Sequence, residues 1–574
     1  MILLLEITAF GFSLSLLYGW LAEFIFVKIF SLRDDHDNHF AVTALLGAAL
    51  LSGLLGIWSF FSKIDSSTVR FFSIFILLGL FVSGKYIFAR LKIIFKQILS
   101  PGLLSWIAFI AIFIYALYMA AASTPTYDTG LYHAQSIRWI ESYRVIPGLA
   151  NLHDRLGFNS NLFLLAAFWG FADKGWFAYQ IPGLVVFASF LIYCLYLINK
   201  PRRAFALSGL TAAGFLFYLL AEQGIIVWFI SPTADLSSTF LSWTIFLLTM
   251  EKLESDDLTQ LDVKTIAIFV LSLFDITIKL SAAPILLISL YFLWKIKPKF
   301  SLQKISKLAL FGALIFLPWL ARNAIISGYL IFPFYQLDIL NVDWKVPHEI
   351  ARHASEVIIS WGRIPYEDSA LVMSMKFNQW FPEWYRTLPP SDSYLINSIL
   401  AASILLGICM VLNRQVKDRV IRYGVIYAVS IVWAFYWLMQ SPSPRFGYGF
   451  LVTLLFIVSI PLIECLLYKI KMPVNVFVLL IQIMLILYTV KLETGFPAKS
   501  WKHYLNSYKP YPAAETSPVK IGNMVLFIPS VNEPFIQDVD AQCWYDTFPC
   551  APFEPSGLSL RGKKIEDGFY IKEK

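Results

Sequence analysis

Long runs of apolar residues, separated by short polar connections, recur along most of the chain. A helix needs about 20 apolar residues to cross the roughly 30 Å hydrocarbon core of a bilayer. Trp, Tyr, Lys and Arg stand at many ends of these runs, where they anchor helices at a membrane surface. The pattern predicts an all-α polytopic membrane protein with about fourteen transmembrane helices. We expect them at residues 3–30, 40–62, 71–90, 103–123, 177–198, 205–222, 236–252, 263–279, 283–296, 305–322, 394–413, 423–440, 447–468 and 473–492.

Composition agrees with a membrane setting. Of the 574 residues, 58% are hydrophobic, 17% are aromatic and only 15% are charged, which is more apolar than a soluble domain requires. The net charge of +8 is spread over connecting loops rather than gathered on one basic face, so the sequence argues against nucleic-acid binding. The first apolar run follows no basic residues and precedes no small-residue cleavage site. We therefore expect it to remain as a helix rather than to be removed as a signal peptide.

The positions of lysine and arginine predict the topology, because short loops rich in these residues stay in the cytoplasm. The loops of this kind are residues 90–96, 200–203, 295–307, 414–422 and 469–471. With these loops inside, both chain ends and the large loops lie outside. Residues 161–171 are too few to span a bilayer, and a crossing there would reverse the later loops. We expect a short juxtamembrane or re-entrant helix at this position, on the outer face.

The same pattern divides the chain into six regions. They are the N-terminal transmembrane helices (1–123), a first outer loop with juxtamembrane helices (124–176), a transmembrane core (177–324), a large outer loop (325–393), the C-terminal transmembrane helices (394–492) and a polar outer tail (493–574). In the large outer loop we expect a helix over 347–361 and an aromatic stretch over 380–385, either as a lid or as membrane-surface anchors. In the tail we expect a pair of short strands around 519–529. Cys543 and Cys550 are expected to form a disulfide in an oxidising compartment.

Asp128 stands just beyond a long apolar run, where a carboxylate is costly unless it is used. The predicted topology places Asp235, Lys279, Arg322 and Arg445 on the same side of the membrane as Asp128. Two carboxylates and three cations at one depth can serve an acid/base step and hold phosphate groups. Asp128 is our candidate catalytic base. The candidates for substrate binding are Tyr127, Tyr132, His133, Arg138, Asp235, Lys279, Arg322, Asn323 and Arg445.

Simpler structural roles are open to several of these residues. Asp128 and Asp235 each precede an expected helix start, where aspartate is a favoured N-cap. Lys279 follows Asp275 by four residues, the spacing of an ion pair on one helix face. Arg322 stands at a helix end, where arginine side chains often reach lipid headgroups.

Three short motifs carry a resemblance to a known family. They are Tyr127-Asp128 with Tyr132-His133, the run Pro318-Trp319-Leu320-Ala321-Arg322-Asn323 followed by Gly328 and Phe332-Pro333, and Pro444-Arg445-Phe446. Together they resemble motifs of the GT-C superfamily of integral-membrane glycosyltransferases, such as bacterial protein O-mannosyltransferases and aminoarabinose lipid A transferases. The chain departs from that pattern in three places, one of which is the run Asn159-Ser160-Asn161 where members commonly carry prolines. About three additional helices precede the acidic motif, and Thr129 stands where many members carry a second acidic residue.

The resemblance implies a GT-C-like enzyme that moves a hexosyl or pentosyl group from a polyprenyl-phosphate donor to a lipid, glycan or protein acceptor. It implies inversion at the anomeric carbon with Asp128 as general base, at the periplasmic face of a bacterial inner membrane. No cofactor follows from the residues, no metal-ligand spacing is present, and a role for a divalent metal stays open. The alternatives are a transporter or flippase of lipid-linked saccharides, or an enzyme that polymerises or ligates them.

Overall fold

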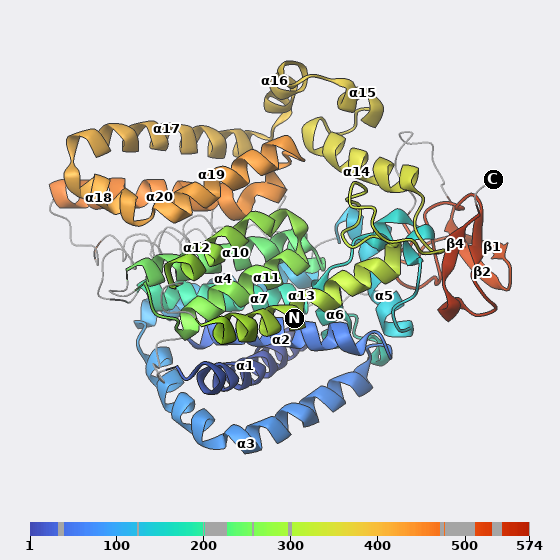
Figure 1. Cartoon of the computed structure of the whole chain (residues 1–574), viewed down its shortest axis with the longest axis horizontal. Helices are drawn as coiled ribbons and strands as arrows, with labels where there is room; N and C mark the ends of the chain where they lie inside the picture. Colours follow the sequence, from blue (N-terminus) through green and yellow to red (C-terminus); the bar gives the residue numbers. More distant parts are fainter. Residues whose placement is uncertain are drawn as a thin grey trace.

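The computed structural model describes residues 1–32, 39–122, 125–198, 200, 227–254, 258–296, 301–470, 476, 511–530 and 542–572. Helices dominate it, and a small group of β-strands lies beyond one end of the helix bundle (Figure 1). Within the described residues, seven helices are long and apolar enough to cross a membrane. They are α1 (Ile2–Phe30), α2 (Phe40–Trp58), α4 (Leu103–Ala122), α7 (Ile181–Ile198), α13 (Leu302–Ser327), α17 (Pro390–Leu412) and α20 (Pro444–Lys469).

Bent helices raise this number to nine if each bent pair is one span. The first is α3 (Ser66–Leu99), which bends by 94° after Gly79, and the second is α18 (Arg414–Arg422) with α19 (Gly424–Met439), which meet at 65°. The structure is therefore that of a largely helical chain compatible with several membrane crossings. The predicted span at 205–222 lies outside the described residues, as does that at 473–492 apart from residue 476.

Three predicted spans correspond to helices that are shorter or more polar than a typical transmembrane helix. The first, α10 (Ala234–Leu253), carries Ser or Thr at six positions and Glu251 and Lys252 near its end. The second, α11 (Val263–Ile278), has 16 residues, and the third, α12 (Leu286–Ile296), has 11 and follows the 3-10 turn η6 (Leu280–Ile285). Most side chains of α10 and α11 are buried, so these helices form the interior of the bundle rather than its lipid-facing surface.

Close helix packing depends on small residues. A methyl group at Gly19 would lie 1.8 Å from the Thr43 carbonyl oxygen, and one at Gly47 would lie 1.7 Å from the Ser15 carbonyl oxygen. Only glycine therefore allows α1 and α2 to approach so closely, which is the usual way in which small residues pack helices in membranes.

Residues 161–171 form a short helix, as expected, but it does not lie on the surface. All ten residues of α6 (Asn161–Gly170) are buried, and the helix packs against α2, α7 and α5 (Ala134–Ser142). Ser160 caps its first turn through a bond from the Leu162 amide. The apolar composition of α6 thus comes from burial inside the bundle rather than from contact with headgroups.

The polar ends of the helices meet at two opposite ends of the bundle. At one end, near α18, Glu251 pairs with Lys200 and Lys264, and Glu254 pairs with Arg419 and Arg422. The candidate residues around Asp128 lie at the other end, with α5 and the β-strands (Figure 1). Basic connections at one end and candidate residues at the other agree with the helix directions that the sequence predicts.

The large loop and the tail add structure at the candidate end. The loop contains α14 (His348–Arg363), α15 (Ser369–Ser374) and α16 (Phe377–Thr387), so the expected helix over 347–361 is present. In the tail, β1 (Thr516–Ile521) pairs antiparallel with β2 (Met524–Pro529), and β3 (Leu558–Leu560) pairs with β4 (Phe569–Ile571). Cys543 and Cys550 form a disulfide.

Candidate functional site

Four charged side chains from distant parts of the chain meet at one end of the bundle. Asp128 precedes the π-helical turn η1 (Thr129–His133), and Asp235 is in the first turn of α10. Lys279 directly follows the last residue of α11, and Arg445 is in the first turn of α20. Lys279 Nζ pairs with Asp235 Oδ1. Arg445 Nη1 lies 3.5 Å from Asp128 Oδ2, and Arg445 Nε lies 3.8 Å from Asp235 Oδ2. We call these four residues the charged cluster.

The capping and local-pair alternatives do not describe these residues. The Asp128 side chain makes no capping hydrogen bond to the turn that follows, and Thr233 rather than Asp235 caps α10. Lys279 pairs with Asp235 instead of with Asp275, whose carboxylate accepts a hydrogen bond from Ser242 at 2.6 Å. The charged cluster is therefore built by tertiary packing, with two acids and two cations in balance.

Accessibility differs within the charged cluster. The Asp128 side chain is 31% exposed and that of Arg445 34%, whereas those of Asp235 and Lys279 are 14% and 15% exposed. Arg445 Nε is buried and makes no hydrogen bond. The Phe446 ring lies beside both cations, 4.0 Å from Lys279 Nζ and 4.9 Å from the Arg445 guanidinium carbon. Asp128 is thus the carboxylate of the cluster that a ligand reaches most easily, next to a cation with an unused donor.

The turn η1 carries His133 into the interior of the bundle. In a π-helical turn the backbone bonds run five residues back, as from the Ala134 amide to the Thr129 carbonyl. His133 is buried, and its Nδ1 lies 3.4 Å from Thr129 Oγ1. Burial lowers the pKa of His133 to about 4, although the Asp128 and Asp235 carboxylates oppose this shift. The imidazole is therefore neutral at pH 7. Tyr127, by contrast, is exposed at the surface.

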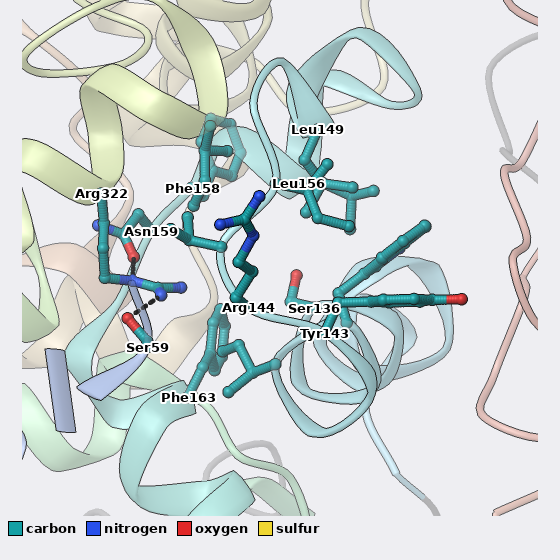
Figure 2. A pocket seen from close by; sticks show the side chains of 15 residues that line it. Ser59, Ser136, Tyr143, Arg144, Leu149, Leu156, Phe158, Asn159, Phe163 and Arg322 are labelled. Atoms are coloured by element: carbon teal, nitrogen blue, oxygen red, sulfur yellow. Dashed lines mark hydrogen bonds between the residues drawn. The ribbon is translucent and has the colours of Figure 1, made fainter. Parts of the chain in front are cut away.

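Arg322 does not join the charged cluster. Its Nη1 donates to Ser59 Oγ at 2.6 Å and its Nε donates to Asn159 Oδ1 at 3.2 Å, as Figure 2 shows. Arg322 as a whole is 3% exposed and forms no ion pair with a carboxylate in the described part of the chain, so it is not a headgroup anchor. The neighbouring Asn323 is buried, and its Nδ2 makes no hydrogen bond.

The cavity beside Arg322 is small. It measures about 30 Å³, enough for about two water molecules. Arg144 and the rings of Phe158 and Phe163 also line it (Figure 2). Phe158 packs against Tyr132 with ring centroids 5.9 Å apart, and Phe163 packs against His133 at 5.4 Å. These rings stand between Arg322 and the turn that follows Asp128, so the sequence prediction of one common cluster is corrected here.

Arg138 binds the tail of the chain. Its guanidinium donates to the Tyr545 carbonyl oxygen and lies over the rings of Tyr545 and Phe548, 4.6 and 4.8 Å from their centroids. A role for Arg138 in direct contact with a donor is therefore not supported by its position. Ser59, Asn159 and Glu141 are polar residues near the site that the sequence did not single out. Each acquires its place only through tertiary contacts, so no local pattern marks it.

Within the described residues, no group of three or more His, Cys, Asp or Glu side chains is arranged to hold a metal ion. The fold and the site thus define a class of largely helical protein, compatible with several membrane crossings, with a charged cluster at one end of its bundle. Residues 1–452 match the model of a family described as "Domain of unknown function (DUF8201)", and the chain belongs to this family. The matched residues include the whole charged cluster but not the tail. No curated protein matches the chain, and no solved structure does.

Proposed function

We propose that the protein is a membrane glycosyltransferase that uses a polyprenyl-phosphate-linked sugar, with Asp128 as general base. One observation carries the proposal: the most accessible carboxylate of the charged cluster lies 3.5 Å from Arg445, whose buried Nε has no hydrogen-bond partner. A buried donor without a partner costs free energy that a ligand oxygen can recover. Arginine is well suited to phosphate oxygens because its planar fork offers several donors.

The reaction that these groups support is a direct displacement. The acceptor oxygen or nitrogen attacks the anomeric carbon of the sugar, and its proton passes to the Asp128 carboxylate. The bond between the anomeric carbon and the phosphate oxygen breaks, and its electron pair leaves with the polyprenyl phosphate. Arg445 and Lys279 stabilise the charge that develops on this phosphate. Attack opposite the leaving group inverts the anomeric carbon.

The geometry refines the roles that the motifs suggest. The donor phosphate is assigned to Arg445 and Lys279, because Arg445 directly neighbours the proposed base. Arg322 lies behind the rings of Phe158 and Phe163 and acts, in this proposal, on the shape and charge of the cavity rather than on the leaving phosphate.

The proposal includes the topology. In it the chain crosses a bacterial inner membrane about fourteen times, as the apolar runs suggest. The charged cluster and the tail face the periplasm, and the basic loops face the cytoplasm. This orientation is checked with a cysteine introduced at Ser517, which is exposed. Intact spheroplasts are treated with a thiol reagent that cannot cross the membrane. Labelling is expected; protection until the cells are lysed would refute it.

Transfer by purified protein tests the proposed reaction. The protein is incubated with defined polyprenyl-phosphate sugars and candidate acceptors, and the release of polyprenyl phosphate is measured. Loss of a general base costs about 10²–10⁴-fold in rate, so Asp128→Asn should lose transfer while still binding the donor. Asp154→Asn is the matched control, because Asp154 lies in the same loop and pairs with His153 instead of with the charged cluster.

Two results would refute the proposal. Near-normal turnover by Asp128→Asn would exclude this residue as the base. Movement of labelled donor across vesicle membranes without cleavage of the sugar–phosphate bond would indicate a transporter.

A further inference from the structure

A loop of the tail lies directly along the segment that follows Asp128. Residues 542–550, closed by the disulfide between Cys543 and Cys550, form this tail loop. More than 400 residues separate it from its partners. Two bonds reach the backbone around Asp128: Gln542 Nε2 donates to the Tyr127 carbonyl and the Trp544 amide donates to the Gly130 carbonyl, both at 2.9 Å. Side chains of α5 bind the tail loop in return, because Gln135 Nε2 donates to the Trp544 and Thr547 carbonyls at 2.9 Å each and Arg138 donates to the Tyr545 carbonyl. The Tyr545 hydroxyl donates to Glu141 at 3.1 Å.

The second of these bonds compensates for the π-helical turn. In an α-helix the Ala134 amide would bond to the Gly130 carbonyl, four residues back. In η1 it bonds instead to the Thr129 carbonyl, five residues back. The Gly130 carbonyl accepts from the Trp544 amide of the tail loop. The tail loop therefore supplies a backbone bond that the irregular turn has given up, at the turn that begins directly after Asp128.

Side-chain packing also brings the tail loop close to η1. A methyl group at Gly130 would lie 2.8 Å from the Trp544 ring, so the ring rests on the backbone of the turn. The far end of the tail loop is fixed to the small sheet, because the Phe527 amide donates to the Pro549 carbonyl and the Ala551 amide donates to the Phe527 carbonyl. The disulfide ties Cys543, next to Trp544, to this fixed end.

We propose that the tail loop is a positioning element for Asp128: by holding η1 in its π-helical form, it sets where the Asp128 carboxylate points. The catalytic consequence rests on the proposed function, whereas the holding of the turn does not. Catalysis is sensitive to displacements of about 1 Å, which can cost about 100-fold in rate. A disulfide that closes a short loop restricts the conformations open to that loop when it is detached. Opening the disulfide should therefore release η1 and weaken transfer.

The experiment combines hydrogen–deuterium exchange with kinetics on the full-length protein. Two variants loosen the tail loop by different routes. The double variant Cys543→Ser/Cys550→Ser removes the disulfide, and Gln135→Met removes two hydrogen bonds while leaving the disulfide intact. In both, peptides covering residues 129–138 should exchange at least about tenfold faster, because local opening controls exchange. The kcat for transfer should fall about tenfold or more, with the KM for the donor within about twofold.

Two controls separate this effect from other losses. Arg561→Ala breaks a tail contact with Asp343 that does not involve η1, and it should leave both readouts unchanged. Asp128→Asn should lose transfer but keep wild-type exchange over 129–138. Wild-type exchange in both loosened variants would overturn the proposal, as would faster exchange with unchanged kcat. If the wild-type protein transfers no sugar at all, the proposed function fails, and the exchange data alone decide whether the tail loop holds the turn.

Discussion

Replacing Glu141 with glutamine should remove one loss of stability that the wild-type protein undergoes as pH rises from about pH 5 to pH 8. Glu141 lies at the join between the core and the tail loop, where the hydroxyls of Tyr179 and Tyr545 donate to its Oε2 at 2.7 and 3.1 Å. Its Oε1 is buried and makes no hydrogen bond. Burial raises the pKa of Glu141 to about 8, although the two tyrosines and Arg138 oppose the shift and Asp173 adds to it.

The size of the effect follows from this pKa. In the unfolded chain the Glu141 carboxyl titrates near its ordinary value of 4.5, and in the folded protein it titrates near 8. The folded state therefore holds a proton that the unfolded state has lost, so stability falls as pH rises between these values. The slope is at most about 1.4 kcal/mol per pH unit, and the total loss is on the order of 5 kcal/mol as an upper bound. Above pH 8 the penalty is constant.

The assay is reversible denaturation of wild-type protein and Glu141→Gln in the same detergent from pH 5 to pH 9. The difference between the two proteins isolates Glu141, because other groups titrate equally in both. The buried His133 and His153 are such groups, because burial lowers the pKa of each to about 4. Both histidines therefore lower the stability of the two proteins equally as pH falls below about 6.5. Glutamine keeps an acceptor for the tyrosines. A constant difference across this range would refute the reasoning.

Three other substitutions test the site by thermal or chemical denaturation. Gly130→Ala should cost about 1–3 kcal/mol, because its methyl group would press on a tryptophan ring of the tail loop 2.8 Å away. Gly183→Ala, where the nearest atom is at 3.5 Å, is the control and should be neutral or stabilising; equal costs for the two would contradict the close fit. Asp235→Asn should cost about 3–5 kcal/mol by leaving its buried lysine partner without a carboxylate, and no measurable loss would show that the pair is not formed. Arg322→Met should stabilise by roughly 1–4 kcal/mol, because it removes a buried charge that no carboxylate neutralises; a loss of stability would mean that its hydrogen bonds dominate.

The sequence predicts helices well where a long apolar run alone determines the element. The bounds of α4, α7 and α17 lie within about four residues of those expected from apolar length. The bounds of α10 are predicted within about two residues, but its buried position is not. Its Ser and Thr side chains bond to carbonyls one turn back, as Thr244 does to Phe240 and Thr249 does to Ile245. Such bonds let a polar helix occupy the interior of the bundle, and hydropathy does not record them.

The partners within the site are harder to predict than its members. The sequence predicts Asp128, Asp235, Lys279 and Arg445 as site residues because each is a charge next to an apolar run. The pairing of Lys279 with Asp235 depends on how α10 packs against α11, whereas local spacing offers Asp275 as an alternative partner. Arg322 shares the end of the bundle with these residues but lines the small cavity beside Phe158 and Phe163, because the direction of a helix face is set by tertiary packing.

The charge balance of the cluster constrains how a donor could bind to it. Two carboxylates already neutralise Arg445 and Lys279, so a phosphate must take these cations from Asp128 and Asp235 rather than meet unpaired charge. Arg445 is the easier of the two to redirect, since its nearest carboxylate oxygen is 3.5 Å away and its Nε lacks a hydrogen bond. Once Arg445 turns to the phosphate, Asp128 loses its neighbouring positive charge and gains a negative one. The Asp128 carboxylate is then no longer paired with Arg445 and can face the acceptor whose proton it takes in the proposed mechanism.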